Sequence, residues 1–546
     1  MSSPITIPHL FRTETSKQLI VNGRPFLMLA AELQNSSMTS AEHMSTIWQA
    51  LVDANINTVL GAVPWEMIEP VEGQYNFEEL DKIILDARKY NLHLVLLWFG
   101  AYKNGVSTYV PSWVKTDTGR FPRAKLRTEE GPLKTSEVLS LFGSEAVVAD
   151  AKAFQALMSH IREIDEAHST VLMVQVENEP GLIGDSRDTS DMAAQKFFEP
   201  VPTDLVEYLL NEADNLHDDF KDNLGYFFSR SPHQANTNWE AVFGQSPKTD
   251  EIFMAYHYAR FVEHVAAAGR REYALPLYTN VWLNSSGDDA DNGFPNVASG
   301  GGDPGNYPSG GATSCVLDIW QKFAPNLDFI SPDIYLNDYA ARRDEYGARR
   351  TWLALGSHAA LGVSPFGIDT LTTNPYRRHY ALLKQVSAII LQAQRKANTT
   401  IGFFFDDIAE DGADPSNPVV CRFGEYELTI ERCFVFGKPG PACGMVIHRG
   451  DGRFLLIGWG FQVGARALAA NATYTGILRV EEKFVEDPVS GTLRMGRLLN
   501  GDETRSGNFA MMPSEDPDYG GFPVAITIPA KSMIAELELY YLVENS

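Results

Sequence analysis

The chain has few cysteines, no long apolar run and no visible leader segment. Its 546 residues include four cysteines, which show neither a metal-ligand spacing nor a disulfide framework, so we expect free thiols. No stretch reaches the ~18 apolar residues that a membrane helix needs. The first residues lack a basic segment followed by an apolar core, which predicts a cytoplasmic protein rather than a secreted one.

Basic residues are also scarce, because 45 Lys and Arg stand against 70 Asp and Glu, for a formal net charge of −25. Nucleic-acid phosphates and anionic membrane surfaces are both bound by clustered Lys and Arg, so neither is an expected partner. The twelve histidines form no HExxH motif and no pair at i, i+4. We therefore expect no metal and no cofactor.

Short apolar runs alternate with helical patterns through most of the chain. The runs predict strands over 26–33, 56–66, 92–100, 171–179, 275–283, 327–335 and 361–369. Helical patterns cover 40–55, 77–91, 148–166, 250–269, 350–360 and 377–397. This alternation predicts a (β/α)8 TIM barrel, and the nearly continuous apolar character of the runs is typical of parallel strands covered on both faces.

Polar and aromatic residues follow one predicted strand after another. In a TIM barrel the C-terminal strand ends and the loops after them build the active site. Carboxylates, amides and flat rings gathered there are suited to a carbohydrate, whose hydroxyls need hydrogen bonds and whose faces stack on aromatic rings. The residues in question are Glu32, Asn35, Trp65, Glu66, Glu69, Trp98, Glu177, Asn178, Glu179, Trp282, Asp333 and Tyr335.

Several long motifs resemble glycoside hydrolase family 35, the β-galactosidase family. The most specific is "QVENEPG" at 175–181, an Asn-Glu pair at the end of the fourth predicted strand. The segment "RFGEYELTIERCFVFGKPG" at 422–440 is similar to a C-terminal β-domain found in a microbial and fungal branch of that family. Further agreement lies in "NGRPFLMLAAELQNSS" (22–37), "VPWEMIEPVEGQYNF" (63–77), "LLWFGAYKNG" (96–105), "SPDIY" (331–335) and "SPFGID" (364–369).

The resemblance implies a retaining exo-glycosidase, β-galactosidase-like, that removes a terminal β-linked sugar from oligosaccharides. Such an enzyme uses two carboxyl groups, one as acid/base and one as nucleophile. By the motif, Glu179 is the acid/base and Asn178 hydrogen-bonds the sugar 2-hydroxyl, while Glu177 has a structural role. The other residues expected to bind substrate are Glu32, Asn35, Trp65, Glu66, Trp98, Trp282 and Tyr335.

The nucleophile is the part of the pattern that the sequence does not supply. In the family it is a Glu at the end of the seventh strand, but residues 336–348 contain no apolar run fit for a buried strand. We therefore predict a truncated or missing seventh strand, with Glu345 as the nearest carboxylate able to replace the nucleophile. An alternative assignment makes 361–369 the seventh strand and 401–407 the eighth, with Asp369 as nucleophile.

Two other functions follow from the missing segment and from the shared chemistry. The alternatives to an active hydrolase are a catalytically impaired sugar-binding barrel and a transglycosylase that uses the same intermediate.

The composition of the chain changes near residue 400. An acidic Gly/Pro stretch is followed by short strands with turn signals, which is typical of an all-β sandwich. We predict a glycosidase barrel over 1–400 and a β-domain over 401–546. This second domain either supports the barrel or binds carbohydrate.

Overall fold

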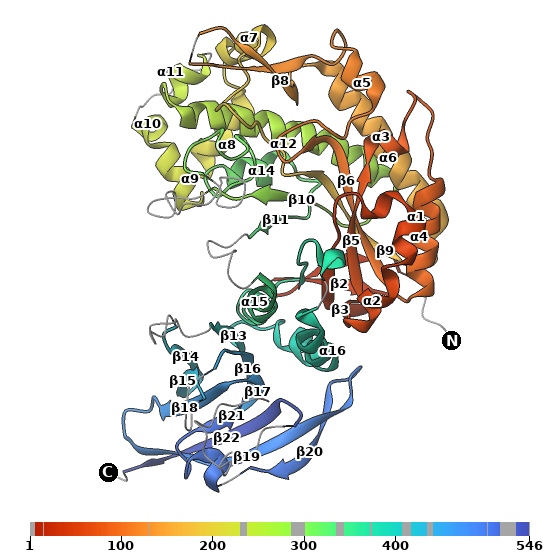
Figure 1. Ribbon diagram of the computed structural model, residues 1–546. Coiled ribbons are helices and arrows are strands. Elements are labelled where there is room, and N and C mark those ends of the chain that lie inside the picture. Colours follow the sequence, from red (N-terminus) through yellow and green to blue (C-terminus); the bar gives the residue numbers. More distant parts are fainter. Residues whose placement is uncertain are drawn as a thin grey trace. The chain divides into compact units, whose positions relative to one another are not determined.

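A curled parallel sheet with flanking helices is followed by an all-β domain in the computed structural model (Figure 1). The structure describes residues 6–14, 16–129, 131–229, 237–284, 301–334, 343–371, 374–406, 416–433, 440–499, 501–513 and 531–544. By its internal contacts the chain divides into two compact units. Unit 1 comprises 1–9, 33–48 and 59–339, and unit 2 comprises 10–32, 49–58 and 340–546. The predicted domain boundary at residue 400 stays a prediction.

The parallel sheet has seven strands in the order β11-β10-β9-β6-β5-β4-β12. Its strands are β4 (Met28–Glu32), β5 (Thr58–Pro64), β6 (His93–Lys103), β9 (Val171–Asn178), β10 (Leu277–Trp282), β11 (Phe329–Asp333) and β12 (Gly362–Val363). Every residue of β5 and β9 is buried, as expected for parallel strands that are covered on both faces. The predicted TIM-barrel class is confirmed, in the form of an incomplete barrel.

Helices accompany the strands of the sheet in both units. In unit 1 they are α1 (Ala41–Ser45), α3 (Trp65–Ile68), α4 (Glu78–Lys89), α5 (Ser112–Thr116), α6 (Ser144–Asp165), α7 (Asp191–Phe198), α8 (Thr203–Asn211), α9 (Asp218–Asn223), α10 (Gly225–Phe228), α11 (Trp239–Phe243), α12 (Pro247–Glu272) and α14 (Leu317–Phe323). Helix α2 (Trp48–Asp53) begins in unit 1 and continues into unit 2, which also contains α15 (Arg343–Ser357) and α16 (Tyr376–Ala393).

The long helix α6 illustrates how sequence spacing positions a helix against the sheet. It buries Phe154, Leu157 and Ile161, which recur at the three- and four-residue spacing of one helix face, and it contacts β6. Helix α12 begins with Ser246 as N-cap and Pro247 in its first turn, two local signals that fix its start.

The structure of the described residues agrees with the prediction that the seventh barrel strand is truncated or missing. Between β11 and β12 these residues form helix α15 rather than a strand. Strand β12 pairs in parallel with β4, with Gly362 opposite Met28, so it takes the place of the last barrel strand beside the first. Strand β11 is at the other end of the strand order.

The alternative that made 401–407 an eighth barrel strand is wrong. Strand β13 (Thr400–Phe405) belongs to a different sheet, where it pairs antiparallel with β16 (Ala442–Gly450). Its aromatic side chains Phe403 and Phe405 pack in the core of the β-domain. Asp369, on a short 3-10 helix after β12, therefore loses the argument that made it a candidate nucleophile.

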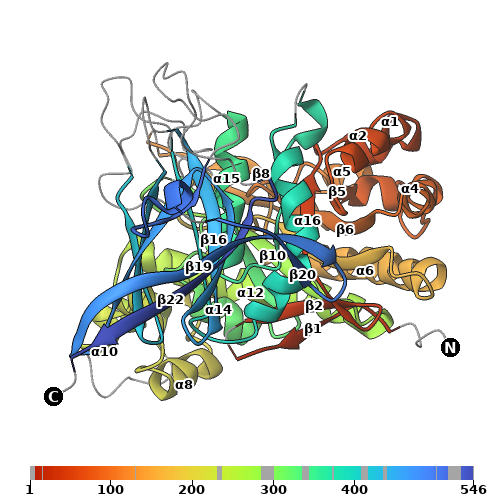
Figure 2. The same ribbon diagram turned by 90° about the horizontal axis from the view of Figure 1, so that it is seen from below.

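The C-terminal part of unit 2 consists of two antiparallel sheets. One has the order β13-β16-β17-β22-β19-β20 and the other β14-β15-β18-β21. Figure 2 shows the long strands β19 and β22 side by side, and they are paired antiparallel. Burial alternates strictly along β15, as expected for a strand with one face in the core. The remaining strands are β14 (Val419–Phe423), β15 (Tyr426–Arg432), β17 (Arg453–Trp459), β18 (Phe461–Ala467), β19 (Ala472–Asp487), β20 (Thr492–Leu498), β21 (Ala510–Met512) and β22 (Ile534–Val543).

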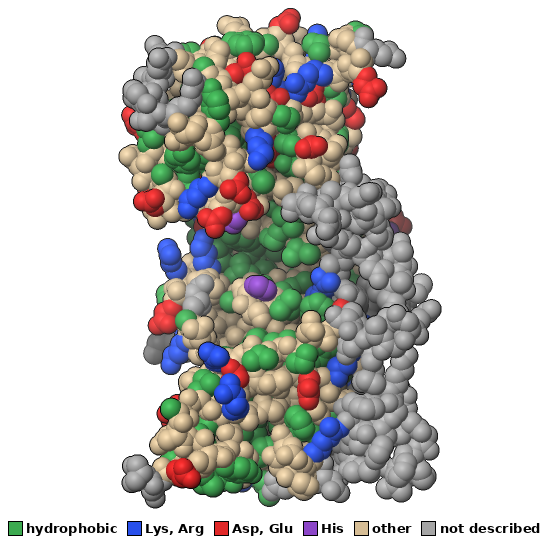
Figure 3. Space-filling model, turned by 90° about the vertical axis from the view of Figure 1, so that its left-hand side faces the viewer, with side chains coloured by type: hydrophobic (Ala, Val, Ile, Leu, Met, Phe, Trp, Pro, Cys, Tyr) green, Lys and Arg blue, Asp and Glu red, His purple; other side chains and the backbone are tan. Residues whose placement is uncertain are grey.

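Two small sheets complete the described strands. The first contains β1 (His9–Arg12), β2 (Lys17–Val21) and β3 (Arg24–Phe26), and the second is the hairpin of β7 (Arg123–Leu126) and β8 (Lys134–Leu139). Acidic and basic side chains are interspersed on the face shown in Figure 3. Among the helices of the described residues, none combines the length and apolarity required to span a bilayer.

Candidate active site at the end of strand β9

Two glutamates at the end of β9, on either side of Asn178, have a backbone conformation that non-glycine residues rarely adopt. Glu177 and Glu179 have φ angles of 60° and 45°. This left-handed region costs free energy, so surrounding contacts must hold the residues there. The Glu179 N–H donates to Asn280 Oδ1 at 2.7 Å, and the Glu179 carbonyl accepts from the Gly105 N–H at 3.1 Å. Strand β10 and the turn after β6 therefore fix the end of β9.

Glu179 is buried and forms part of a small carboxyl and amide cluster. Its side chain hydrogen-bonds Asp333, at the end of β11, and Asp333 Oδ2 accepts from Asn280 Nδ2 at 2.7 Å. Burial raises the pKa of Glu179 above its ordinary value, while the bond with Asp333 and the charge of Lys103 act in the opposite direction. A raised pKa keeps a carboxyl group protonated closer to neutral pH, as a general acid requires.

Asn178 is oriented by a lysine from the neighbouring strand. Lys103 Nζ donates to Asn178 Oδ1 at 3.0 Å. An ammonium group can only donate, so the amide oxygen faces Lys103 and the amide nitrogen points elsewhere. This orientation leaves Asn178 Nδ2 as a donor for a hydroxyl group of a ligand.

Glu177 is fully buried, and its side chain contacts Asp150 of helix α6. Glu177 Oε2 accepts from the Tyr102 N–H at 2.7 Å. Asp150 accepts from the Ala101 N–H at 2.9 Å and from Trp98 Nε1 at 2.8 Å. These contacts agree with a structural role for Glu177.

Replacing Gly100 by Ala is expected to destabilise this region. An added Cβ would lie 2.4 Å from Trp98 Nε1, 2.5 Å from Glu177 Oε1 and 2.8 Å from Asp150 Oδ1. Trp98 and Asp150 are bonded to each other, and the Glu177 side chain is held through its other oxygen by the Tyr102 N–H. Overpacking of this kind costs about 2 kcal/mol, and we expect the Tm to fall by about 2 °C. The control is Gly225→Ala, because no atom lies within 4 Å of a Cβ at that position. Equal Tm values for the two variants would show that the cluster has room to adjust.

The structure places two of the predicted substrate-binding tryptophans in the core. Trp65 and Trp98 are both 0% exposed. Trp65 Nε1 donates to Glu69 at 2.8 Å, as Trp98 does to Asp150. Neither ring has surface available for stacking on a sugar, so these positions favour packing over ligand contact.

The other predicted binding residues come from several strand ends, and one of them, Trp282, is paired with Asp333 of the cluster around Glu179. Glu66 is exposed and pairs with Lys115 at 2.9 Å. Asn35 follows strand β4 and Trp282 is the last residue of strand β10, and both side chains are half-buried. Glu32 ends β4, and its backbone bridges to Phe366. For these four residues a substrate contact stays a prediction.

Two predicted residues fall partly or wholly outside the described part of the chain. Tyr335 lies outside the described residues. Glu345 is on helix α15, and its side chain is outside them. A nucleophilic role for Glu345 therefore stays a prediction, although its backbone is helical and does not end a strand.

Three residues of the cluster were not predicted from the sequence. Asp150 falls four residues before Phe154 on the apolar face of α6, so an acidic residue on that face was a usable signal. Asn280 is likewise a polar residue within an apolar run. Lys103 gave no local signal, because its partner is 75 residues away in the sequence.

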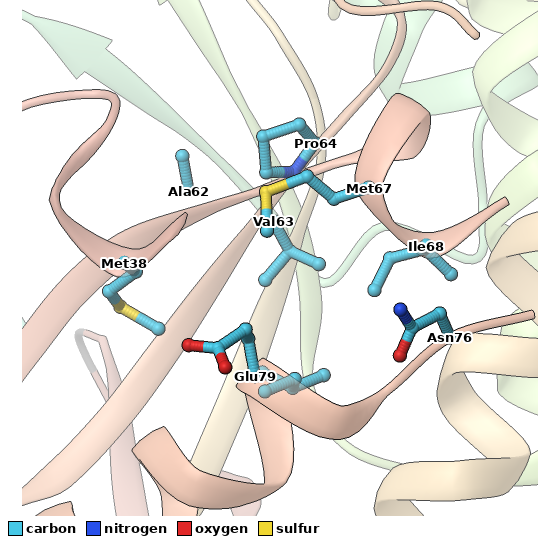
Figure 4. Close-up of a pocket in the computed structure, with 9 residues that line it drawn as sticks. Met38, Ala62, Val63, Pro64, Met67, Ile68, Asn76 and Glu79 are labelled. Carbon is cyan, nitrogen blue, oxygen red and sulfur yellow. The ribbon is translucent and has the colours of Figure 1, made fainter. Parts of the chain in front are cut away.

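A small cavity beside β5 is separate from this cluster (Figure 4). Its one carboxylate, Glu79, already accepts from the Ala41 N–H at 2.8 Å and pairs with Lys82 at 2.8 Å. The cavity is mostly apolar and offers no group for catalysis. Its lining residues are Met38, Ala62, Val63, Pro64, Met67, Ile68, Asn76, Glu79 and Leu80.

A buried carboxyl group with a raised pKa, beside an amide at the C-terminal end of a barrel strand, is the arrangement of a glycoside hydrolase. Comparison with known families agrees with that class. Residues 35–229 match the model of glycoside hydrolase family 42, described as beta-galactosidase. This match supports a β-galactosidase-like glycoside hydrolase domain within the chain. It does not single out family 35, which the motifs resemble.

The C-terminal region matches a family without an assigned role. Residues 376–511 correspond to the domain of unknown function DUF5597. No curated protein matches the chain.

Solved structures with some likeness to the chain include two β-galactosidases and a β-amylase. The β-galactosidase from Bacillus circulans sp. alkalophilus is 15% identical, with 67% of this chain and 57% of that chain covered and a TM-score of 0.40. The one from Rahnella sp. R3 has the same identity, with 67% and 56% covered and a TM-score of 0.38. The catalytic domain of the Paenibacillus polymyxa β-amylase is 14% identical, with 55% and 75% covered and a TM-score of 0.35. The chain thus spans less than two thirds of the length of the two β-galactosidases.

Proposed function

We propose that the protein is a retaining β-galactosidase-like glycosidase of the family 35 type, with Glu179 as acid/base. The observation that carries this proposal is the burial of Glu179 at the end of β9, next to an amide whose oxygen is held by Lys103. The protonated carboxyl of Glu179 donates to the leaving oxygen, and after the aglycone leaves, the carboxylate takes a proton from water. Asn178 Nδ2 donates to the sugar 2-hydroxyl, where the bond strengthens in the transition state.

Asp333 is assigned as a partner of Glu179 and not as the nucleophile. Retaining glycosidases hold their two carboxyl groups about 5–5.5 Å apart, so that the anomeric carbon fits between them. Asp333 is in direct hydrogen-bond contact with Glu179, which leaves no such space. Glu345 is the proposed replacement for the nucleophile.

A second candidate is a sugar-binding barrel with impaired catalysis. The observation in its favour is that the described residues between β11 and β12 form helix α15, where the family has its seventh strand. A transglycosylase of the same mechanism differs only in the acceptor of the glycosyl group.

Turnover of nitrophenyl β-galactoside, compared with the β-glucoside, tests the proposed activity. We expect faster release from the galactoside, and a rise in Tm with galactose because a ligand that binds only the folded state stabilises it. Galactose binding without turnover would support the impaired barrel. Neither turnover nor binding of either sugar would contradict both candidates.

Trapping with a 2-fluoro-glycosyl inhibitor and peptide mapping identifies the nucleophile. A label on Glu345 is the expected result. A label on another carboxylate would replace this assignment, and turnover without any label would contradict the covalent mechanism.

A further inference from the structure

Strand β6 contains a large bulge opposite the end of β9. In the pairing of the two strands, Trp98 lies opposite Val176 and Lys103 lies opposite Asn178. Between these pairs β6 has four residues, 99–102, and β9 has Glu177 alone. A bulge of this size leaves backbone groups of β6 without partners in the ladder, and these groups need other acceptors because the segment is buried.

Two buried carboxyl groups accept the free N–H groups of this bulge. Glu177 Oε2 accepts from the Tyr102 N–H at 2.7 Å, and Asp150 Oδ2 accepts from the Ala101 N–H at 2.9 Å. Asp150 Oδ1 accepts from Trp98 Nε1 at 2.8 Å. Both carboxyl groups are 0% exposed, so water does not replace these bonds.

The contacts also locate a proton. Both oxygens of Asp150 accept from N–H groups, whereas Glu177 Oε1 is buried and meets no donor in hydrogen-bond geometry, since the nearby Ala101 N–H is bonded to Asp150. The two side chains contact each other, and two buried negative charges in contact repel strongly. A single proton on Glu177 Oε1, donated to Asp150, removes the repulsion and satisfies that oxygen. Burial and the charge of Asp150 raise the pKa of Glu177 well above its ordinary value, in agreement with this placement.

We propose that Asp150 and protonated Glu177 form a positioning pair, which holds the β6 bulge so that Lys103 stays against Asn178. The pair does not touch the substrate and acts through Lys103, whose ammonium sets the orientation of the Asn178 amide. The effect of the pair on kinetics rests on the proposed glycosidase function, because the pair would act through Asn178. The location of the proton does not depend on that function.

The proton predicts different outcomes for two isosteric variants. In Glu177→Gln the amide oxygen accepts from the Tyr102 N–H and the NH₂ group donates to Asp150, so every bond is kept. In Asp150→Asn the NH₂ group faces the N–H of Ala101 or Trp98, so one bond becomes a clash of donors. We expect kcat/KM to fall less than about threefold in the Gln variant and about 100-fold in the Asn variant. Equal losses, or a larger loss in the Gln variant, would overturn the assignment of the proton.

The pH dependence of stability tests the proton without any assay of activity. A carboxyl group with a raised pKa in the folded state stabilises it fully below its unfolded pKa, and this contribution is lost as pH rises through the folded pKa. Glu177→Gln removes the contribution of Glu177, while that of Asp150, whose pKa is also raised by burial, remains. We therefore expect the Tm of the variant, relative to the parent, to rise by about 2 °C between pH 4 and pH 8. A constant difference would overturn the proposal, even if the protein proves to hydrolyse no glycoside.

A double-mutant cycle with Asn178 separates positioning from a general effect on folding. If the pair acts through Asn178, then Asp150→Asn lowers kcat/KM about 100-fold in the parent but less than about threefold in the Asn178→Ala background. The same cycle is repeated with Glu177→Ala in place of Asp150→Asn, and kcat and KM are measured separately. The same loss in both backgrounds would show that the pair only supports the fold. If the parent hydrolyses no glycoside, the proposed function fails and the Tm measurement alone decides the placement of the proton.

Discussion

Replacing Glu179 by Gln is expected to lower kcat by about 10³-fold for substrates with a sugar leaving group. The amide cannot donate an acidic proton to the leaving oxygen, so the loss is greatest where that oxygen most needs protonation. A nitrophenol leaves without such help, so hydrolysis of the nitrophenyl galactoside should be much less affected at the first step. Added azide should then attack the glycosyl-enzyme and yield a glycosyl azide of retained configuration, because azide needs no general base.

The control for this experiment is Glu163→Gln, which replaces an exposed glutamate on helix α6. That variant should hydrolyse both substrates at the parent rate. Equal losses on the two leaving groups in Glu179→Gln, with no azide product, would contradict the acid/base role. Circular dichroism and the Tm of both variants show whether folding is unchanged.

Replacing Asn178 by Ala is expected to lower kcat/KM for the galactoside about 10²-fold, the usual loss when one donor to the transition state is removed. The reason is specific, because Lys103 holds the amide oxygen and leaves Nδ2 as the donor to the 2-hydroxyl. For a 2-deoxy-galactoside, which has no such hydroxyl, we expect the variant and the parent to differ less than about threefold.

Asn211→Ala is the matched control, since Asn211 is exposed at the end of helix α8. It should leave both substrates unaffected. A loss of equal size on the galactoside and the 2-deoxy-galactoside in Asn178→Ala would mean that Asn178 does not bind the 2-hydroxyl.

The strands of the barrel could be predicted because their signal is local. β5 and β9 are buried along their whole length, so each appears in the sequence as an apolar run. The same signal does not identify the sheet to which a strand belongs. β13 is an equally apolar run, yet it pairs antiparallel with β16 in the β-domain. Membership of a sheet depends on tertiary pairing, for which a single run gives no information.

The candidate site was predictable only where a motif covers consecutive residues. Asn178 and Glu179 stand together in the sequence, but their partners Lys103 and Asp333 come from other strands. Aromatic residues at strand ends were ambiguous for a physical reason, because a ring that stacks on sugar and a ring that packs in a core are the same side chain. Trp98 proved to be of the second kind.

The position of β11 at one end of the sheet has a consequence for solubility. A terminal strand offers its outer N–H and C=O groups to other chains and is a starting point for aggregation. β11 contains Pro332, which has no N–H to offer, and proline within sheets is confined to such edge positions. The strand is also only five residues long, which limits the length over which a second chain can pair. Among the described residues, the sheet of this incomplete barrel therefore ends on a strand whose own sequence limits self-association.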